Sequence, residues 1–202
     1  MRRLAAIPAV LLLALGACGD GEDEPEGPVE TADTEQSPSI DPSETVELDL
    51  ESAGGACPFI DGAQLNSITG EDFRFASGGP EEDTGEDAPD QATCAVQTGE
   101  AAYPDLTLFI IGTDASVDVY KEQAPEDSKS TEGLGEAGYW IVHTEDTGAG
   151  PALEMGWYDG GDIFEMRYTT PEGTDPAAVE ALVNDFAGLA NGINDAHAAQ
   201  DE

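Results

Sequence analysis

The residues that could carry out chemistry in this chain are three cysteines, two histidines and 44 carboxylates. No Gly-x-Ser-x-Gly motif and no recognisable Ser, His and Asp set accompanies them, which argues against a serine nucleophile. His143 and His197 lack the further ligands that a zinc site needs. A carboxylate acts as a catalytic acid or base when a pocket shifts its pKa, and sequence alone does not single one out. We therefore predict no catalytic residue, no metal site and no cofactor.

Two of the cysteines, Cys57 and Cys94, form an even pair, and the third, Cys18, lies apart near the N-terminus. No C-x-x-C motif is present, which argues against a redox pair or a zinc site. In an exported chain an even pair indicates a disulfide, and two buried free thiols are the alternative. Because 36 residues separate the two cysteines, such a disulfide would contribute about 4 kcal/mol in the chain-entropy treatment.

The first residues of the chain indicate export. Arg2 and Arg3 precede an apolar run from Leu4 to Leu15, and small residues follow it. This order is typical of a secretory signal peptide. The run is also shorter than the ~20 apolar residues that a helix needs to span a bilayer. We therefore expect residues 1–17 to be a signal peptide.

The segment Leu15-Gly16-Ala17-Cys18 resembles the lipobox of bacterial lipoproteins. This resemblance implies cleavage before Cys18 and transfer of a diacylglyceryl group to the Cys18 thiol. An ordinary secretory signal with an incidental cysteine is the alternative. We expect the lipid on Cys18 to hold the protein on the extracytoplasmic face of the cell membrane.

The mature chain would be strongly acidic. From Cys18 onward it has four Lys or Arg residues against 44 Asp or Glu residues, which is a net charge of −40. Nucleic-acid binding requires clustered basic residues and is therefore not expected. The same charge argues against electrostatic attachment to anionic lipids, so a covalent lipid is the expected link to the membrane.

Composition divides the mature chain into three parts. Residues 18–56 contain thirteen Asp or Glu residues, no Lys or Arg and no aromatic residue, which predicts a disordered tether. The globular domain is expected over 57–194, followed by a polar tail over 195–202. Within the domain, the acidic segment 77–90 is expected to be an exposed loop. Calcium binding there is the alternative, although the EF-hand loop pattern is absent.

Periodicity and turn residues predict an α+β domain. Helices are expected from about 60 to 70, from Asp114 to Ala124 and from Pro176 to Ile193. Strands are expected over 73–76, 91–98, 106–112, 139–144, 152–158 and 163–169. The order α-βββ-α-βββ-α predicts a single antiparallel sheet of about six strands with helices packed on one face.

Aromatic residues gather on the last three predicted strands. Because side chains alternate along a strand, about half of them would face outward if one face of the sheet were uncovered. In that case Tyr139, Trp140, Trp157 and Tyr158 would form a binding face for a glycan, a lipid or a partner protein. The alternative is that these rings fill a core.

These features together resemble a family of uncharacterised actinobacterial lipoproteins with a domain of unknown function. The matching features are Cys18, the acidic tether, Cys57 before the first helix, Cys94 in an early strand and the segment Gly133-Leu134-Gly135-Glu136-Ala137-Gly138-Tyr139. One departure is that Ala95-Val96 follows Cys94, where an aromatic residue is common in the family. The family has no assigned chemistry, so the resemblance implies no catalytic residue.

We therefore expect a lipid-anchored binding or interaction module of the cell envelope that is not an enzyme. Its partners would be the membrane, through the lipid on Cys18, and an envelope protein or a small apolar ligand. One alternative is an envelope hydrolase whose carboxylate pair is hidden among many acids. Another is a solute-binding or lipid-binding accessory to a transporter.

Overall fold

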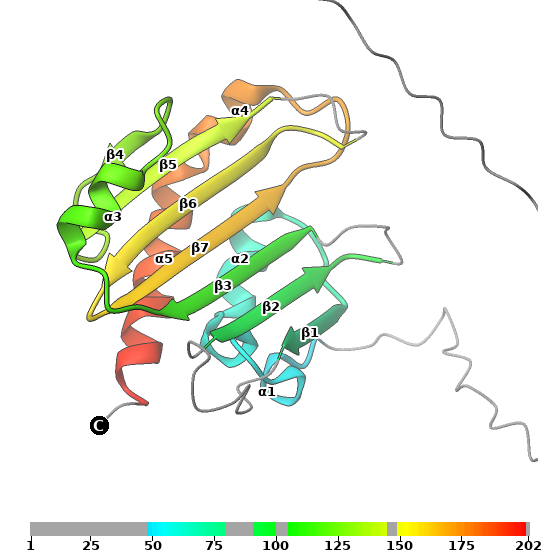
Figure 1. Cartoon of the computed structure of the whole chain (residues 1–202). Helices are drawn as coiled ribbons and strands as arrows, with labels where there is room; N and C mark the ends of the chain where they lie inside the picture. The colour runs from blue at the N-terminus through cyan, green and yellow to red at the C-terminus, as the bar shows by residue number, and fades with distance from the viewer. Residues whose placement is uncertain (1–47, 80–90, 100–104, 145–148, 201–202) are drawn as a thin grey trace, which may run out of the picture. The chain divides into compact units, whose positions relative to one another are not determined.

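The computed structural model describes residues 48–79, 91–99, 105–144 and 149–200 of this 202-residue chain. They form a seven-stranded antiparallel sheet with helices on both faces (Figure 1). The strands are β1 (Phe75–Gly79), β2 (Gln91–Gln97), β3 (Leu106–Gly112), β4 (Lys129–Thr131), β5 (Ala137–His143), β6 (Ala152–Asp159) and β7 (Asp162–Thr169). Their order in the sheet is β1-β2-β3-β7-β6-β5-β4, so two meanders meet where β3 pairs with β7.

The helices flank this sheet unequally. They are α1 (Leu50–Ala53), a 3-10 turn η1 (Cys57–Phe59), α2 (Gly62–Thr69), α3 (Val117–Gln123), α4 (Pro176–Ala181) and α5 (Val183–Ala198). In Figure 1, α2 and α5 lie behind the sheet, whereas α3 lies in front of β5. Among the described helices none is long and apolar enough to cross a membrane.

The hydrophobic core lies between the sheet and α5. One row of core side chains runs across five paired strands: Cys94, Leu108, Met166, Met155 and Trp140. The apolar stripe of α5 packs on this face of the sheet through Val183, Phe186, Leu189, Ala190 and Ile193. This face is called the covered face.

Local signals in the sequence explain where the helices begin. The Asp61 carboxylate accepts a hydrogen bond from the backbone N–H of Gln64 at the start of α2, and Ser116 caps α3 in the same way. Asp175 caps α4, and Pro176 occupies its first position, where a missing N–H costs nothing. Gly70 ends α2 in the left-handed conformation that favours glycine.

The predicted α+β class with a single antiparallel sheet is confirmed, and the finer prediction is corrected in three respects. The sheet has seven strands because the short polar strand β4, which has no apolar pattern, also joins it. The helices cover both faces because Tyr120 of α3 packs against Tyr139 and Tyr158, on the side away from the core. The last helix is interrupted at Leu182, which separates α4 from α5.

The predicted disulfide between Cys57 and Cys94 is confirmed. It joins η1 to β2 on the covered face, with the two Cα atoms 4.9 Å apart.

The folded region extends beyond the predicted boundaries at both ends. Leu48 and helix α1 fall within the range predicted as tether, and their apolar side chains pack against the core. At the other end α5 continues to Ala198. The predicted signal peptide, Cys18 and the predicted tether as far as residue 47 lie outside the described residues, as do residues 80–90. Residues 77–79, which were expected in the acidic loop, belong instead to strand β1.

Candidate functional site

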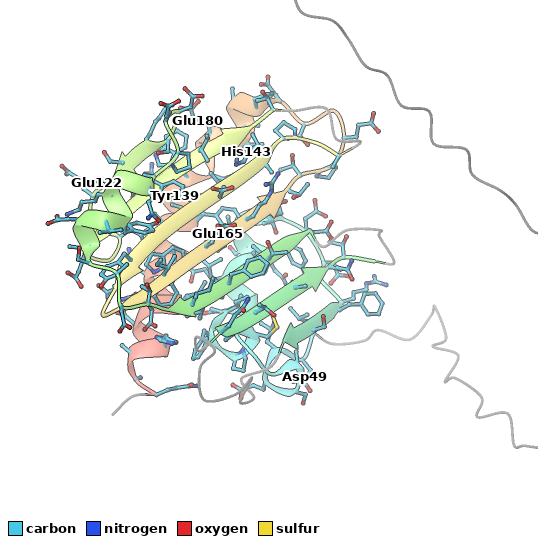
Figure 2. The ribbon with its side chains drawn as sticks, viewed as in Figure 1. Asp49, Glu122, Tyr139, His143, Glu165 and Glu180 are labelled. Atoms are coloured by element: carbon cyan, nitrogen blue, oxygen red, sulfur yellow. A yellow bond between two sulfur atoms is a disulfide. The ribbon has the colours of Figure 1, made fainter. Side chains whose placement is uncertain are left out.

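Side chains that alternate with the core residues point to the opposite side of the sheet, away from α2 and α5. We call this side the open face. Its central residues are Thr107, Phe109, Ile111, Tyr139, Ile141, His143, Glu154, Ile163, Glu165 and Arg167. All of them are at least partly accessible, whereas Cys94, Leu108, Met155 and Met166 of the core row are buried. Figure 2 shows Tyr139, His143 and Glu165 together on this side.

Glu154 is the centre of a polar cluster on the open face. The Tyr139 hydroxyl donates a hydrogen bond of 3.1 Å to Glu154 Oε1, and His143 Nε2 lies 2.8 Å from Glu154 Oε2. Arg167, the direct cross-strand partner of Glu154, places Nη1 3.9 Å from the same Oε2. Only 12% of the Glu154 side chain is exposed. Its charge is therefore held by partners on two neighbouring strands.

Glu165 of β7 is a diagonal neighbour of Glu154 of β6, but the two carboxylates have different polar contacts. Glu165 is exposed, and no hydrogen bond or ion pair joins its carboxylate to another described residue. Partial loss of solvent raises the pKa of Glu165, and the negative charge of Glu154 raises it further. Arg167 and His143 oppose this shift without cancelling it. Among the described residues, no cation forms an ion pair with the Glu165 carboxylate.

Tyr120 brings a second unsatisfied group to the cluster. Its ring, carried by α3, lies 6.3 Å from the Tyr139 ring and 5.9 Å from the Tyr158 ring. The residue is 8% exposed, and its hydroxyl has no hydrogen-bond partner in the described part of the chain. Burial, followed by the charges of Glu165 and Glu154, raises the pKa of Tyr120, so its hydroxyl stays protonated.

A glycine makes room for this arrangement. Gly156 pairs with both Tyr139 and Glu165 in the sheet. A Cβ atom on Gly156 would lie 2.4 Å from Tyr139 Cε1 and 2.8 Å from the Tyr120 hydroxyl oxygen. The Tyr139 ring and the Tyr120 hydroxyl therefore lie directly against the backbone of β6.

The cluster is suited to an organic cation. Glu165 has no ion-pair partner among the described residues, and an ammonium group could donate to its carboxylate. Phe109 is the cross-strand partner of Glu165 and supplies an aromatic ring beside the carboxylate, as cation recognition often uses. The described residues contain no group of three or more His, Cys, Asp and Glu side chains that could hold a metal ion.

The structure does not form the possible aromatic binding face and agrees instead with the alternative, in which the rings are covered. Tyr139 and Trp140 are adjacent in sequence, as are Trp157 and Tyr158, so each pair must divide between the two faces of the sheet. Trp157 is fully buried, stacks 4.9 Å from Phe164 and donates a hydrogen bond to Asn194. Trp140 packs against the core, and Tyr158 is covered by Tyr120. Of the four, only Tyr139 joins the polar cluster.

Two pockets lie elsewhere on the domain. One, of about 790 Å³, is lined by residues of α1 and α2 and by Phe73. The other, of about 490 Å³, lies beside the end of β5, with Pro176, Ala177 and Glu180 of α4 on its wall. Neither Glu154 nor Glu165 lines these two pockets.

Glu154, Glu165 and Arg167 were not among the residues predicted from the sequence to form a site. A signal was nevertheless present, because each of these charged residues interrupts an otherwise apolar strand segment, ALEMGWY or IFEMRY. No family model, curated protein or solved structure significantly similar to this chain was found. The function must therefore be inferred from the open face and from the N-terminal motif.

Proposed function

We propose that this protein is a lipid-anchored binding module of the cell envelope that holds a compact organic cation at Glu165 on the open face. The observation that carries the binding role is an exposed carboxylate close to a tyrosine hydroxyl, where neither group has an ion-pair or hydrogen-bond partner in the described part of the chain. The location rests on the signal-peptide pattern and on the lipobox-like segment ending at Cys18. The same motifs support membership of the actinobacterial lipoprotein family.

The expected ligand carries an ammonium, guanidinium or quaternary ammonium group. Its charge would offset Glu165, while Phe109 and Tyr139 would contact its carbon atoms. Binding would favour the ionised form of Glu165 and would therefore lower the raised pKa of that carboxyl. Ligand uptake near that pKa is expected to release a proton.

Calorimetric titration of the full-length mature chain tests this proposal. The probes are n-butylammonium and tetramethylammonium, with n-butanol as the uncharged analogue. We expect saturable binding of a cation and no binding of n-butanol. Glu165→Gln should weaken cation binding at least tenfold, since a charge-assisted contact is lost.

Glu172→Gln is the matched control, because Glu172 is also exposed but lies in the turn after β7. It should leave cation affinity unchanged. Equal weakening by Glu165→Gln and Glu172→Gln would show only non-specific attraction to an acidic protein. That outcome, or no binding of either cation, would overturn the proposal.

Hydrolysis is a second candidate function, favoured by the two carboxylates on one face. Glycoside hydrolases use such a pair, with the acid at a raised pKa, and the pKa of Glu165 is raised. We favour binding because both oxygens of Glu154 already face Tyr139 and His143. Release of reducing ends from purified cell-wall glycan by the wild type, lost in Glu165→Gln, would support the hydrolase instead.

A further inference from the structure

One strand edge of the sheet is left partly unpaired. Strand β4 covers β5 only from Gly138 to Trp140. The next residues of β5, Ile141 to His143, pair with β6 on their inner side. On their outer side no described residue pairs with them. Alternate residues of such an edge direct backbone N–H and C=O groups outward, ready to pair with another strand.

This edge opens into the pocket of about 490 Å³ described above. Residues from Trp140 to Thr144 form one wall, and Pro176, Ala177 and Glu180 of α4 form the other. Asp127 and Lys129 line it as well. We call this pocket the β5 groove. Figure 2 shows His143 near the end of β5 and Glu180 on α4.

We propose that the β5 groove receives an extended, basic peptide segment of a partner protein, which adds a strand beside Ile141–His143. An exposed strand edge recognises extended chains through backbone hydrogen bonds, and neighbouring pockets select the side chains. The helix α4 stands opposite the edge and would hold the added strand against β5. The groove therefore fits an extended segment.

The negative charge of the protein and of the groove favours a basic peptide segment over an acidic one. The mature chain carries a net charge of −40, and both Asp127 and Glu180 line the groove. The acidic N-terminal region of the chain itself would be repelled from this place. A lysine or arginine of the partner would meet the Asp127 carboxylate, which no described cation pairs with.

Lys129 shows how the groove accommodates a cation. Its ammonium forms a 2.5 Å ion pair with Glu180, which bridges the two walls. The same ammonium lies 4.2 Å from the centre of the Trp140 ring. A basic side chain of the partner could replace Lys129 at either contact, because both contacts are exposed and weak. This inference rests on the sheet edge and is independent of Glu165.

The test uses a short, capped peptide of alternating lysine and valine as the probe. Tryptophan fluorescence provides the readout, because Trp140 lines the groove whereas Trp157 is fully buried and unaffected. We expect saturable binding with a shift of Trp140 emission. The same peptide with N-methylated backbone amides has equal charge but cannot pair, and it should bind at least tenfold more weakly.

Two variants of α4 locate the binding site. Ala177→Phe fills the groove and should weaken peptide binding at least tenfold. Ala178→Phe is the matched control, since Ala178 is also exposed but does not line the groove. Circular dichroism should show that both variants fold. Glu165→Gln should leave peptide binding unchanged, which separates this site from the open face.

Several results would overturn the inference. Equal affinity for the N-methylated peptide would mean attraction by charge alone. The inference would also fail if the peptide did not bind, or if its binding survived Ala177→Phe. If sedimentation showed that the wild type is a dimer and that Ala177→Phe is a monomer, the strand edge would instead pair with a second copy of the chain, and the inference would be overturned.

Discussion

Glu154 and Glu165 show how strongly position governs the behaviour of one residue type. They lie on adjacent strands of the same face, yet Glu154 has three polar partners and Glu165 has none among the described residues. A paired carboxylate stabilises the fold or orients its neighbours, whereas an unpaired one in partly apolar surroundings is available to a ligand. The difference arises from which side chains the register places beside each carboxylate.

Replacing Glu165 with glutamine should make the protein more stable at neutral pH. The raised pKa of Glu165 means that the folded state favours the protonated form. Its contribution to stability is therefore fully present below the ordinary value of 4.5 and is lost as the pH rises through the raised value. Glutamine does not ionise, so the variant does not lose this stability as the pH rises. Because Glu165 is exposed and screened by solvent, the gain should stay below about 1 kcal/mol.

Denaturant unfolding of wild type and Glu165→Gln across the acidic-to-neutral range measures this effect. The two unfolding free energies should converge at low pH, where Glu165 is protonated in both the folded and the unfolded state. A variant less stable than wild type at neutral pH would contradict this account of Glu165.

At the scale of elements, α3 is held on the open face through Tyr120 and its contact with β6. Gly156→Ala should disturb that contact, since the new Cβ would collide with Tyr139 and Tyr120. We expect a loss of about 1–3 kcal/mol in unfolding free energy, as in other overpacked sites. Urea denaturation measures this loss. Gly99→Ala is the control, because a Cβ on Gly99 meets no atom within 4 Å; an equal loss there would refute the packing argument.

The disulfide joins two further elements, η1 and β2, across a sequence separation of 37 residues. Replacing both Cys57 and Cys94 with alanine should lower the unfolding free energy by about 4 kcal/mol, because the unfolded chain loses its cross-link. Comparison of denaturation curves for the variant and the oxidised wild type gives the value. Reduced wild type should unfold like the variant. Unfolding that is insensitive to reduction would show that the link contributes little.

The elements that could be predicted are those with a strong local pattern. Strand β3, the β6–β7 hairpin and the apolar stripe of α5 were predicted close to their observed bounds. Strand β4 and helix α1 were not, since Lys129–Thr131 has no apolar pattern and Leu50–Ala53 is a single turn in an acidic segment. Tertiary packing decides such short elements.

The candidate site depends on sheet register, which a single sequence does not specify. Glu154 meets Arg167, His143 and Tyr139 only because β5, β6 and β7 pair in one particular alignment. The possible aromatic binding face is absent for a simpler reason. Adjacent residues such as Trp157 and Tyr158 cannot share a face of a strand, so their grouping in sequence did not imply grouping in space.

At the scale of the whole molecule, the proposed lipid anchor on Cys18 would determine where the acidic chain is located. Cys18→Ala should abolish incorporation of labelled fatty acid and release the protein into the medium. Membrane fractionation after metabolic labelling measures both effects. Cys57→Ala, which alters a cysteine of the folded domain, should keep the label. Continued labelling of Cys18→Ala would refute the lipobox assignment.

The pairing of β3 with β7 also determines the order in which the strands of the sheet can pair as the chain folds. As the chain is made from its N-terminus, strands β1 to β3 become available first, but β3 has its outer partner only once β7 follows. Until then one long apolar strand, LTLFIIG, presents an open edge to other chains. The dense negative charge of the preceding N-terminal segment would keep such incomplete chains apart. Acidity that restricts the partners of the finished protein would thus also protect it while it folds.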